Sequence, residues 1–163
     1  MPSPMTIKIE VEPYLKEFMH AIFGASPINF PKGHVLNFVL RHLLDRPPRD
    51  IKELNNYNNF IEIQIPYDDQ KNVIYNFHLS EESKKILKKR IEREFRLTFR
   101  DDINASRLSG IKRVDAVWLF IDKYQLNPGN IDMLLKDYHR NYHLKYMHRT
   151  RKKNANKSRQ LKD

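Results

Sequence analysis

A ladder of apolar residues, each four positions after the one before, runs through the middle of the chain and limits the folds open to it. The ladder consists of Leu87, Ile91, Phe95 and Phe99. Apolar residues at this spacing occupy one side of an α-helix, which the rest of the protein must cover. Ser80 stands before the segment as an N-cap, and Glu81 and Glu82 occupy the first turn, where the helix dipole favours acids. The pattern predicts a helix over 80–102, followed by a loop over 103–110.

Alternation and helical spacing predict the remaining elements. Apolar and polar residues alternate in three short segments, and turn-forming residues join the last two, which predicts a β-hairpin. The predicted strands cover 6–11, 60–65 and 73–79. Apolar residues at helical spacing predict four further helices. These helices cover 13–23, 32–45, 111–125 and 131–149, with a turn over 127–130 between the last two.

We therefore expect an α+β fold that is mainly helical. A small antiparallel sheet, made of the β-hairpin 60–79 and the N-terminal strand, packs against the first three helices. Residues 1–105 form an α+β core domain, and residues 106–149 form a C-terminal helical hairpin of the helix-turn-helix type. Residues 150–163 form a basic flexible tail, because they contain too few apolar residues to offset the entropy of ordering.

Several residue types and motifs are absent, and each absence excludes a class of protein. The 163 residues include no cysteine, which excludes disulfides and cysteine-ligated zinc, and only four scattered glycines, which form neither a P-loop nor a dinucleotide-binding motif. No apolar run approaches the roughly 20 residues of a membrane-spanning helix, and the start of the chain has no secretory signal. No hydrolase motif occurs. We expect a soluble cytoplasmic protein that is not an enzyme and has no cofactor, metal, small-molecule substrate or membrane partner.

The net charge of +10 lies mostly at one end of the chain. The last 28 residues carry ten of the 30 Lys and Arg residues but only two of the 20 Asp and Glu residues. Such an excess predicts a polyanionic partner, because each phosphate that a cation neutralises releases condensed counterions. The candidate binding residues of this segment are Lys136, Arg140, Lys145, Arg149, Arg151, Lys152 and Lys153.

A second group of cations lies on one side of the helix predicted over 80–102. It consists of Lys85, Lys89, Arg93, Arg96 and Arg100. On a helical wheel the five span an arc of about 80°, away from the apolar ladder and bordered by Glu92. Cations in a row repel one another unless an anion compensates them, so we predict a helix that lies along a phosphate backbone, against the alternative of a solvated face.

These two groups predict a non-enzymatic protein that binds nucleic acid, DNA rather than RNA. Helices 111–125 and 131–149 have the dimensions of a helix-turn-helix. In a winged-helix alternative, helix 32–45 reads the groove through polar residues and the hairpin 60–79 is the wing. Those residues are Lys32, His34, Asn37 and Arg41. The composition, basic, asparagine-rich and free of cysteine, resembles that of accessory DNA-binding proteins of phages and mobile elements, a resemblance that covers composition only.

Three further features leave other functions open. Tyr138, Tyr142 and Tyr146 recur every four residues, which suits either stacking on single-stranded RNA or DNA bases or packing against a core. His139 and His143 have the spacing of two metal ligands, but no third ligand accompanies them. The basic tail could instead bind an acidic protein, which would make the chain a structural or protein-interaction module.

Overall fold

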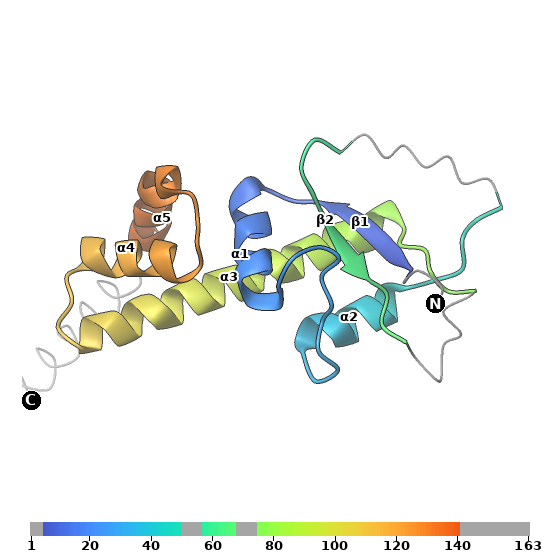
Figure 1. The fold of residues 1–163 in the computed structure, drawn as a ribbon, viewed down its shortest axis with the longest axis horizontal. Helices are drawn as coiled ribbons and strands as arrows, with labels where there is room; N and C mark the ends of the chain where they lie inside the picture. Colours follow the sequence, from blue (N-terminus) through green and yellow to red (C-terminus); the bar gives the residue numbers. More distant parts are fainter. Residues whose placement is uncertain (1–4, 50–56, 68–74, 141–163) are drawn as a thin grey trace, which may run out of the picture.

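The computed structural model describes residues 5–49, 57–67 and 75–140, and these residues form the mainly helical α+β fold expected from the sequence. One long helix, α3, runs the length of the molecule, with β1, β2 and α2 at one end, α4 and α5 at the other and α1 between them (Figure 1). In chain order the elements are β1 (Thr6–Glu10), α1 (Pro13–Phe23), α2 (Val35–Leu43), β2 (Phe60–Gln64), α3 (Glu81–Leu108), α4 (Arg113–Lys123), the 3-10 helix η1 (Pro128–Asn130) and α5 (Ile131–Tyr138).

The sheet consists of β1 and β2, which pair antiparallel from Thr6 opposite Gln64 to Glu10 opposite Phe60. The side chains of Ile9, Ile61 and Ile63 are buried, as the alternation of the two strands predicts. On the other edge of β2, Ile28 forms an isolated parallel bridge with Ile63, so both edges of β2 are occupied at this point.

The β-hairpin expected between residues 60–65 and 73–79 does not form in the described residues, and β2 pairs with β1 and not with residues 75–79. Residues 75–79 contain no strand, while residues 73–74 lie outside the described ranges. His78 bridges Asp45 after α2 instead of pairing with β2. The physical reason is that β1 and Ile28 already take the backbone groups on the two edges of β2. Leu79 is nevertheless buried in the core, as its place in the alternating pattern predicts.

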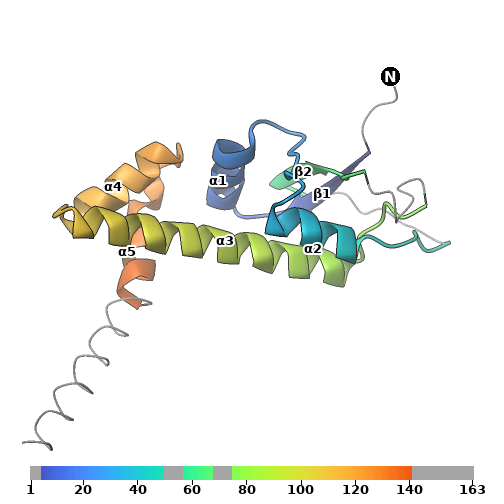
Figure 2. The ribbon, with the colours of Figure 1, turned by 90° about the horizontal axis from the view of Figure 1, so that it is seen from below.

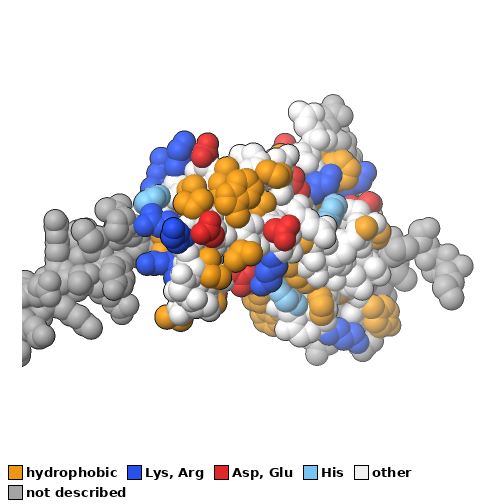
Figure 3. All heavy atoms as spheres, turned by 60° about the vertical axis from the view of Figure 1, so that its left-hand side comes forward, with side chains coloured by type: hydrophobic (Ala, Val, Ile, Leu, Met, Phe, Trp, Pro, Cys, Tyr) orange, Lys and Arg blue, Asp and Glu red, His pale blue; other side chains and the backbone are white. Residues whose placement is uncertain are grey.

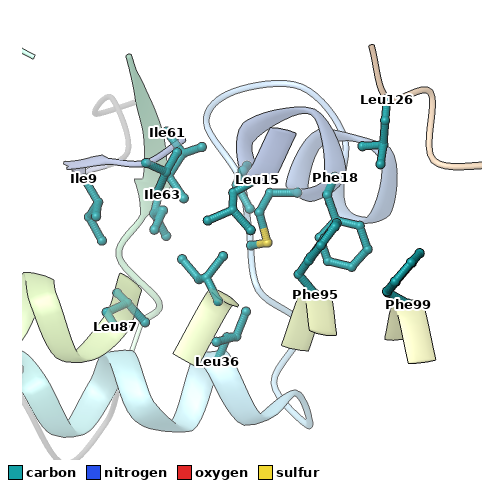
Figure 4. Close-up of a cluster of buried hydrophobic side chains, with 14 of the residues drawn as sticks. Ile9, Leu15, Phe18, Leu36, Ile61, Ile63, Leu87, Phe95, Phe99 and Leu126 are labelled. Carbon is teal, nitrogen blue, oxygen red and sulfur yellow. The ribbon is translucent and has the colours of Figure 1, made fainter. Parts of the chain in front are cut away.

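Helix α3 begins where the sequence predicts. The hydroxyl of Ser80 accepts a hydrogen bond from the backbone N–H of Ser83 at 3.1 Å, and Glu81 and Glu82 lie in the first turn. All four residues of the apolar ladder are buried. Figure 4 shows Leu87 near Leu36 of α2, whereas Phe95 and Phe99 lie toward α1 and Leu126.

Successive residues of the ladder face different parts of the protein because four residues turn an α-helix by more than one full turn. Each step of the ladder advances about 40° around the axis, so its buried stripe winds around the helix. Phe95 packs edge-on against Phe18 of α1, with ring centroids 5.0 Å apart. Phe99 packs against Phe120 of α4 at 4.9 Å. One helix thereby joins the sheet end of the core to its C-terminal end.

The loop predicted over 103–110 is wrong in its first part, because α3 continues to Leu108. Ile103 is fully buried and stands four residues after Phe99, so it is a fifth member of the ladder. The helix ends at Leu108, and Gly110, two residues later, has a φ of +83°, in the left-handed region that glycine adopts without strain. The predicted domain boundary at residue 105 falls inside α3, and the division into domains stays a prediction.

The C-terminal part of the described chain consists of α4, η1 and α5. The turn predicted over 127–130 contains η1, where the side chain of Asn127 accepts a hydrogen bond from the N–H of Gly129 at 2.8 Å. Helix α5 runs across the direction of α3 and α4 (Figures 1 and 2). Beyond its last residue, Tyr138, a π-helical turn includes residues 139 and 140, and the remainder of the helix predicted to 149 lies outside the described residues.

Candidate nucleic-acid interface

Four of the five cations predicted on one side of α3 are exposed to solvent. Lys85, Lys89, Arg93 and Arg96 form no ion pair or hydrogen bond with any residue that the structure describes. Arg100 is half-buried, and its Nε lies 3.0 Å from the Asp101 carboxylate. The first four therefore keep their positive charge available to an external anion.

Lys84 and Lys88, which directly precede Lys85 and Lys89 on α3, form ion pairs within the protein. Lys88 forms an ion pair with Glu12 at 2.9 Å, and Lys84 forms one with Glu81 at 2.8 Å and donates to the hydroxyl of Tyr57 at 3.0 Å. Burial alone would lower the pKa of Lys84, but the hydrogen bonds to Glu81 and Tyr57 outweigh it and raise the pKa above its ordinary value of 10.5. On one side of α3, Lys84 and Lys88 therefore have acidic partners, whereas the exposed cations on the adjacent side form no ion pair with the described residues.

A shallow depression of about 410 Å³ lies among the exposed cations of α3. Lys89, Arg93 and Arg96 line it together with Glu92 and Leu97. Three cations around a single half-buried carboxylate leave an excess of positive charge at this place. An anionic oxygen could approach the three cations here, although Glu92 would oppose it.

The cations predicted at the C-terminal end are described only in part. Lys136 and Arg140 are exposed, on α5 and on the π-helical turn that follows it. Neither forms an ion pair within the described part of the chain. The other predicted binding residues of this segment lie outside the described ranges. They are Lys145, Arg149, Arg151, Lys152 and Lys153.

A further group of cations, which the sequence does not predict, lies where α3 ends and α4 begins. Arg107 donates from Nη1 to the hydroxyl of Tyr138 at 2.6 Å. The guanidinium of Arg113 lies 5.3 Å from the centre of the Tyr138 ring, and its Nη1 lies 2.7 Å from Nε2 of His139. Arg107 stands seven residues after Arg100 and therefore continues the row of cations on α3, a signal that the predicted loop concealed.

Two kinds of side chain are gathered at this end of the molecule. Figure 3 shows Lys, Arg and His side chains on one side of it and exposed hydrophobic side chains beside them. The exposed apolar residues of α4 include Val114, Trp118 and Leu119. Acidic side chains are interspersed among them.

Tyr138 takes part in the core and not in a stacking surface. Its side chain is 3% exposed, its ring lies under Arg113 and its hydroxyl holds Arg107. A buried ring cannot stack on a nucleic-acid base. Tyr142 and Tyr146, the other members of the predicted row, lie outside the described residues.

Two of the residues named in the winged-helix alternative have structural roles. Asn37 is 2% exposed, and its amide donates to the carbonyl of Phe30 at 2.7 Å. The ring of His34 caps α2 by accepting from the N–H of Leu36 at 3.2 Å and packs against Phe23. These contacts account for Asn37 and His34 by packing and capping, without a base contact.

The helix-turn-helix interpretation has its elements in sequence order. Helix α4 packs on α3, and α5 packs on α4 after the turn that contains η1. Asp132, Met133 and Lys136 are exposed along α5. Entry of α5 into a DNA groove stays a prediction, and Asp132 would face phosphates there unfavourably.

The described residues offer neither a metal site nor a membrane span. No group of three or more histidine, aspartate and glutamate side chains within the described ranges could hold a metal ion. None of the described helices has both the length and the apolar character that crossing a bilayer requires. Comparison with known proteins finds no matching family model, no matching curated protein and no matching solved structure.

Proposed function

We propose that this protein is a non-enzymatic nucleic-acid-binding protein that contacts the phosphates of double-stranded DNA. The exposed cations of α3 would meet the backbone, and Lys136, Arg140 and the basic residues beyond them would add further contacts. The observation that supports the proposal best is the difference between two sides of one helix. Lys84 and Lys88 have acidic partners within the protein, whereas Lys85, Lys89, Arg93 and Arg96 have none among the described residues.

The length of the cationic row suits a DNA backbone. A helix rises 1.5 Å per residue, so the row from Lys85 to Arg100 is about 22 Å long. One strand of B-DNA carries a phosphate every 3.4 Å along the helix axis, so roughly six phosphates lie within that length. A duplex therefore offers an anion for each cation of the row, which a small acidic ligand does not.

Paired lysine substitutions on α3 test this proposal with a matched control. K85Q/K89Q removes two exposed cations from the row, and K84Q/K88Q removes the same number, at the same spacing, from the adjacent side. Because K85Q/K89Q leaves two phosphates without a cation, it should bind a fluorescent 20-base-pair duplex about ten- to one-hundredfold more weakly at low salt. The control should show only the small effect of its lower net charge, because its ammonium groups already have partners.

Fluorescence anisotropy with duplex and single-stranded probes measures both variants. Thermal unfolding followed by circular dichroism establishes that both variants remain folded. An equal decrease of affinity in K85Q/K89Q and K84Q/K88Q would contradict the proposal that the exposed cations of α3 contact the DNA backbone. Tighter binding of single strands than of the duplex would contradict the choice of double-stranded DNA.

A further inference from the structure

Arg107, Arg113, Tyr138 and His139 form a cluster, here called the arginine cluster, at the junction of α3, α4 and α5. Both guanidinium groups contact Tyr138, one through its hydroxyl and the other through its ring. Neither arginine forms an ion pair with an acid in the described part of the chain. Two uncompensated guanidinium groups on one tyrosine repel each other unless an anion lies between or beside them.

The position of Arg113 adds to this argument. Lys112 and Arg113 occupy the N-cap and the first position of α4, where the helix dipole disfavours cations, and Lys112 makes no side-chain cap. The stability of α4 therefore does not explain these residues. Arg140, which follows His139 in the sequence, is a further exposed cation.

The hydrogen-bond donors of the arginine cluster are only partly used. Arg107 is exposed, and its hydrogen bond to Tyr138 engages Nη1 alone. Arg113 donates from Nη1 to one ring nitrogen of His139, with Nε2 at 2.7 Å, and its buried Nε has no partner among the described residues. A guanidinium group has five N–H donors in a planar fork and accepts nothing, so the donors that remain on the terminal nitrogens, unlike the buried Nε of Arg113, suit the paired oxygens of a phosphate.

We infer that the arginine cluster is a second phosphate-binding site, which takes a phosphodiester group of the same nucleic-acid backbone that the row on α3 contacts. Arg107 and Arg113 bind the phosphate oxygens, and Tyr138 is a positioning residue because its buried ring and hydroxyl orient both guanidinium groups. The inference rests on the proposed function. It extends the contact surface by one helix, from α3 to the start of α4.

Arg107 is the residue through which to test the site, because its side chain is exposed whereas Tyr138 is buried. The affinity of the full chain for a fluorescent duplex is measured over a series of salt concentrations for R107Q, R107K and a control, K123Q. Lys123 lies at the other end of α4, where it forms an ion pair with Asp102 at 2.8 Å. R107Q and K123Q therefore each remove one positive charge, at opposite ends of the pair of helices α3 and α4.

R107Q should bind the duplex about tenfold more weakly than the wild type, and its slope of log affinity against log salt should be less negative by about one. R107K keeps the charge but not the planar fork, so it should keep the slope while its affinity falls about threefold. K123Q should match the wild type in both. In Tyr138→Phe the number of cations is unchanged, so the slope should stay while the affinity falls.

Equal slopes and affinities for R107Q and K123Q would overturn the inference, as would wild-type affinity in R107K. Both results leave the proposed function intact if the wild type itself depends steeply on salt. A wild type that binds without salt dependence would instead overturn the proposed function, so the two failures are distinguishable.

Discussion

The carboxylate of Glu12 lies 2.9 Å from the ammonium group of Lys88, and this ion pair connects the start of α1 with α3. Burial alone would raise the pKa of Glu12, but the hydrogen bond from Lys88, a backbone hydrogen bond and the charge of Lys88 together outweigh burial. The pKa of Glu12 is therefore lowered from its ordinary value of 4.5. Lys88 thus has an acidic partner within the protein, whereas Lys89 forms no ion pair with the described residues.

The lowered pKa of Glu12 predicts how E12Q changes stability with pH. A carboxyl whose pKa is lower in the folded than in the unfolded state stabilises the protein above pH 4.5, and this contribution is lost as the pH falls through the folded pKa. E12Q should therefore be less stable than the wild type at pH 7 by under about 1 kcal/mol, since the pair is partly exposed. The difference should disappear in acid.

Urea denaturation of the wild type and E12Q between pH 7 and pH 3 measures this effect. E10Q is the control, because Glu10 is exposed and has no ion pair among the described residues. A difference between E12Q and the wild type that is the same at every pH would show that the carboxylate of Glu12 does not stabilise the fold through its charge.

At the scale of single elements, α3 is the helix with the strongest sequence signals and also the one whose predicted end is wrong. The ladder residues, the cap at Ser80 and the acids of the first turn are local signals, and all are confirmed. Asp101, Asp102 and Asn104 interrupt the apolar pattern and favour a loop. The four-residue spacing nevertheless continues to Ile103, whose burial in the core favours helix over loop.

A comparison of two apolar residues on α3 tests this account of the helix. Ile103 is 0% exposed and Leu108 is 90% exposed, on the same helix five residues apart. I103A should lower the free energy of unfolding by about 2–5 kcal/mol, because it leaves a cavity in the core. L108A should change it by less than about 0.5 kcal/mol. Urea denaturation measures both, and a similar small change in the two variants would contradict the packing of the last turns of α3.

At the scale of the whole molecule, the features that the sequence does not predict are those that depend on contacts between distant parts of the chain. The fold class follows from local periodicity, and the exposure of Lys85, Lys89, Arg93 and Arg96 follows from their side of the helix. The partner of β2 depends on competition between β1, Ile28 and residues 75–79 for its two edges, which alternation does not reveal. The arginine cluster likewise requires α3, α4 and α5 to meet at Tyr138.

The binding surface proposed here draws on cations from several segments of the chain. These cations are the row on α3, Arg107 and Arg113 of the arginine cluster at the end of α3 and the start of α4, and Lys136 and Arg140 on and after α5. The last 28 residues, which include Lys136 and Arg140, carry most of the net charge of +10. Under the proposed function, these cations would contact a backbone of regularly spaced phosphates.

The salt dependence of duplex binding by the wild-type protein tests this central claim most directly. Fluorescence anisotropy with a 20-base-pair duplex gives the affinity between 50 and 300 mM salt. If about six phosphates are engaged, log affinity plotted against log salt should fall with a slope near −5, because each neutralised phosphate contributes about −0.9. A slope near zero, or no binding at 50 mM salt, would contradict the account.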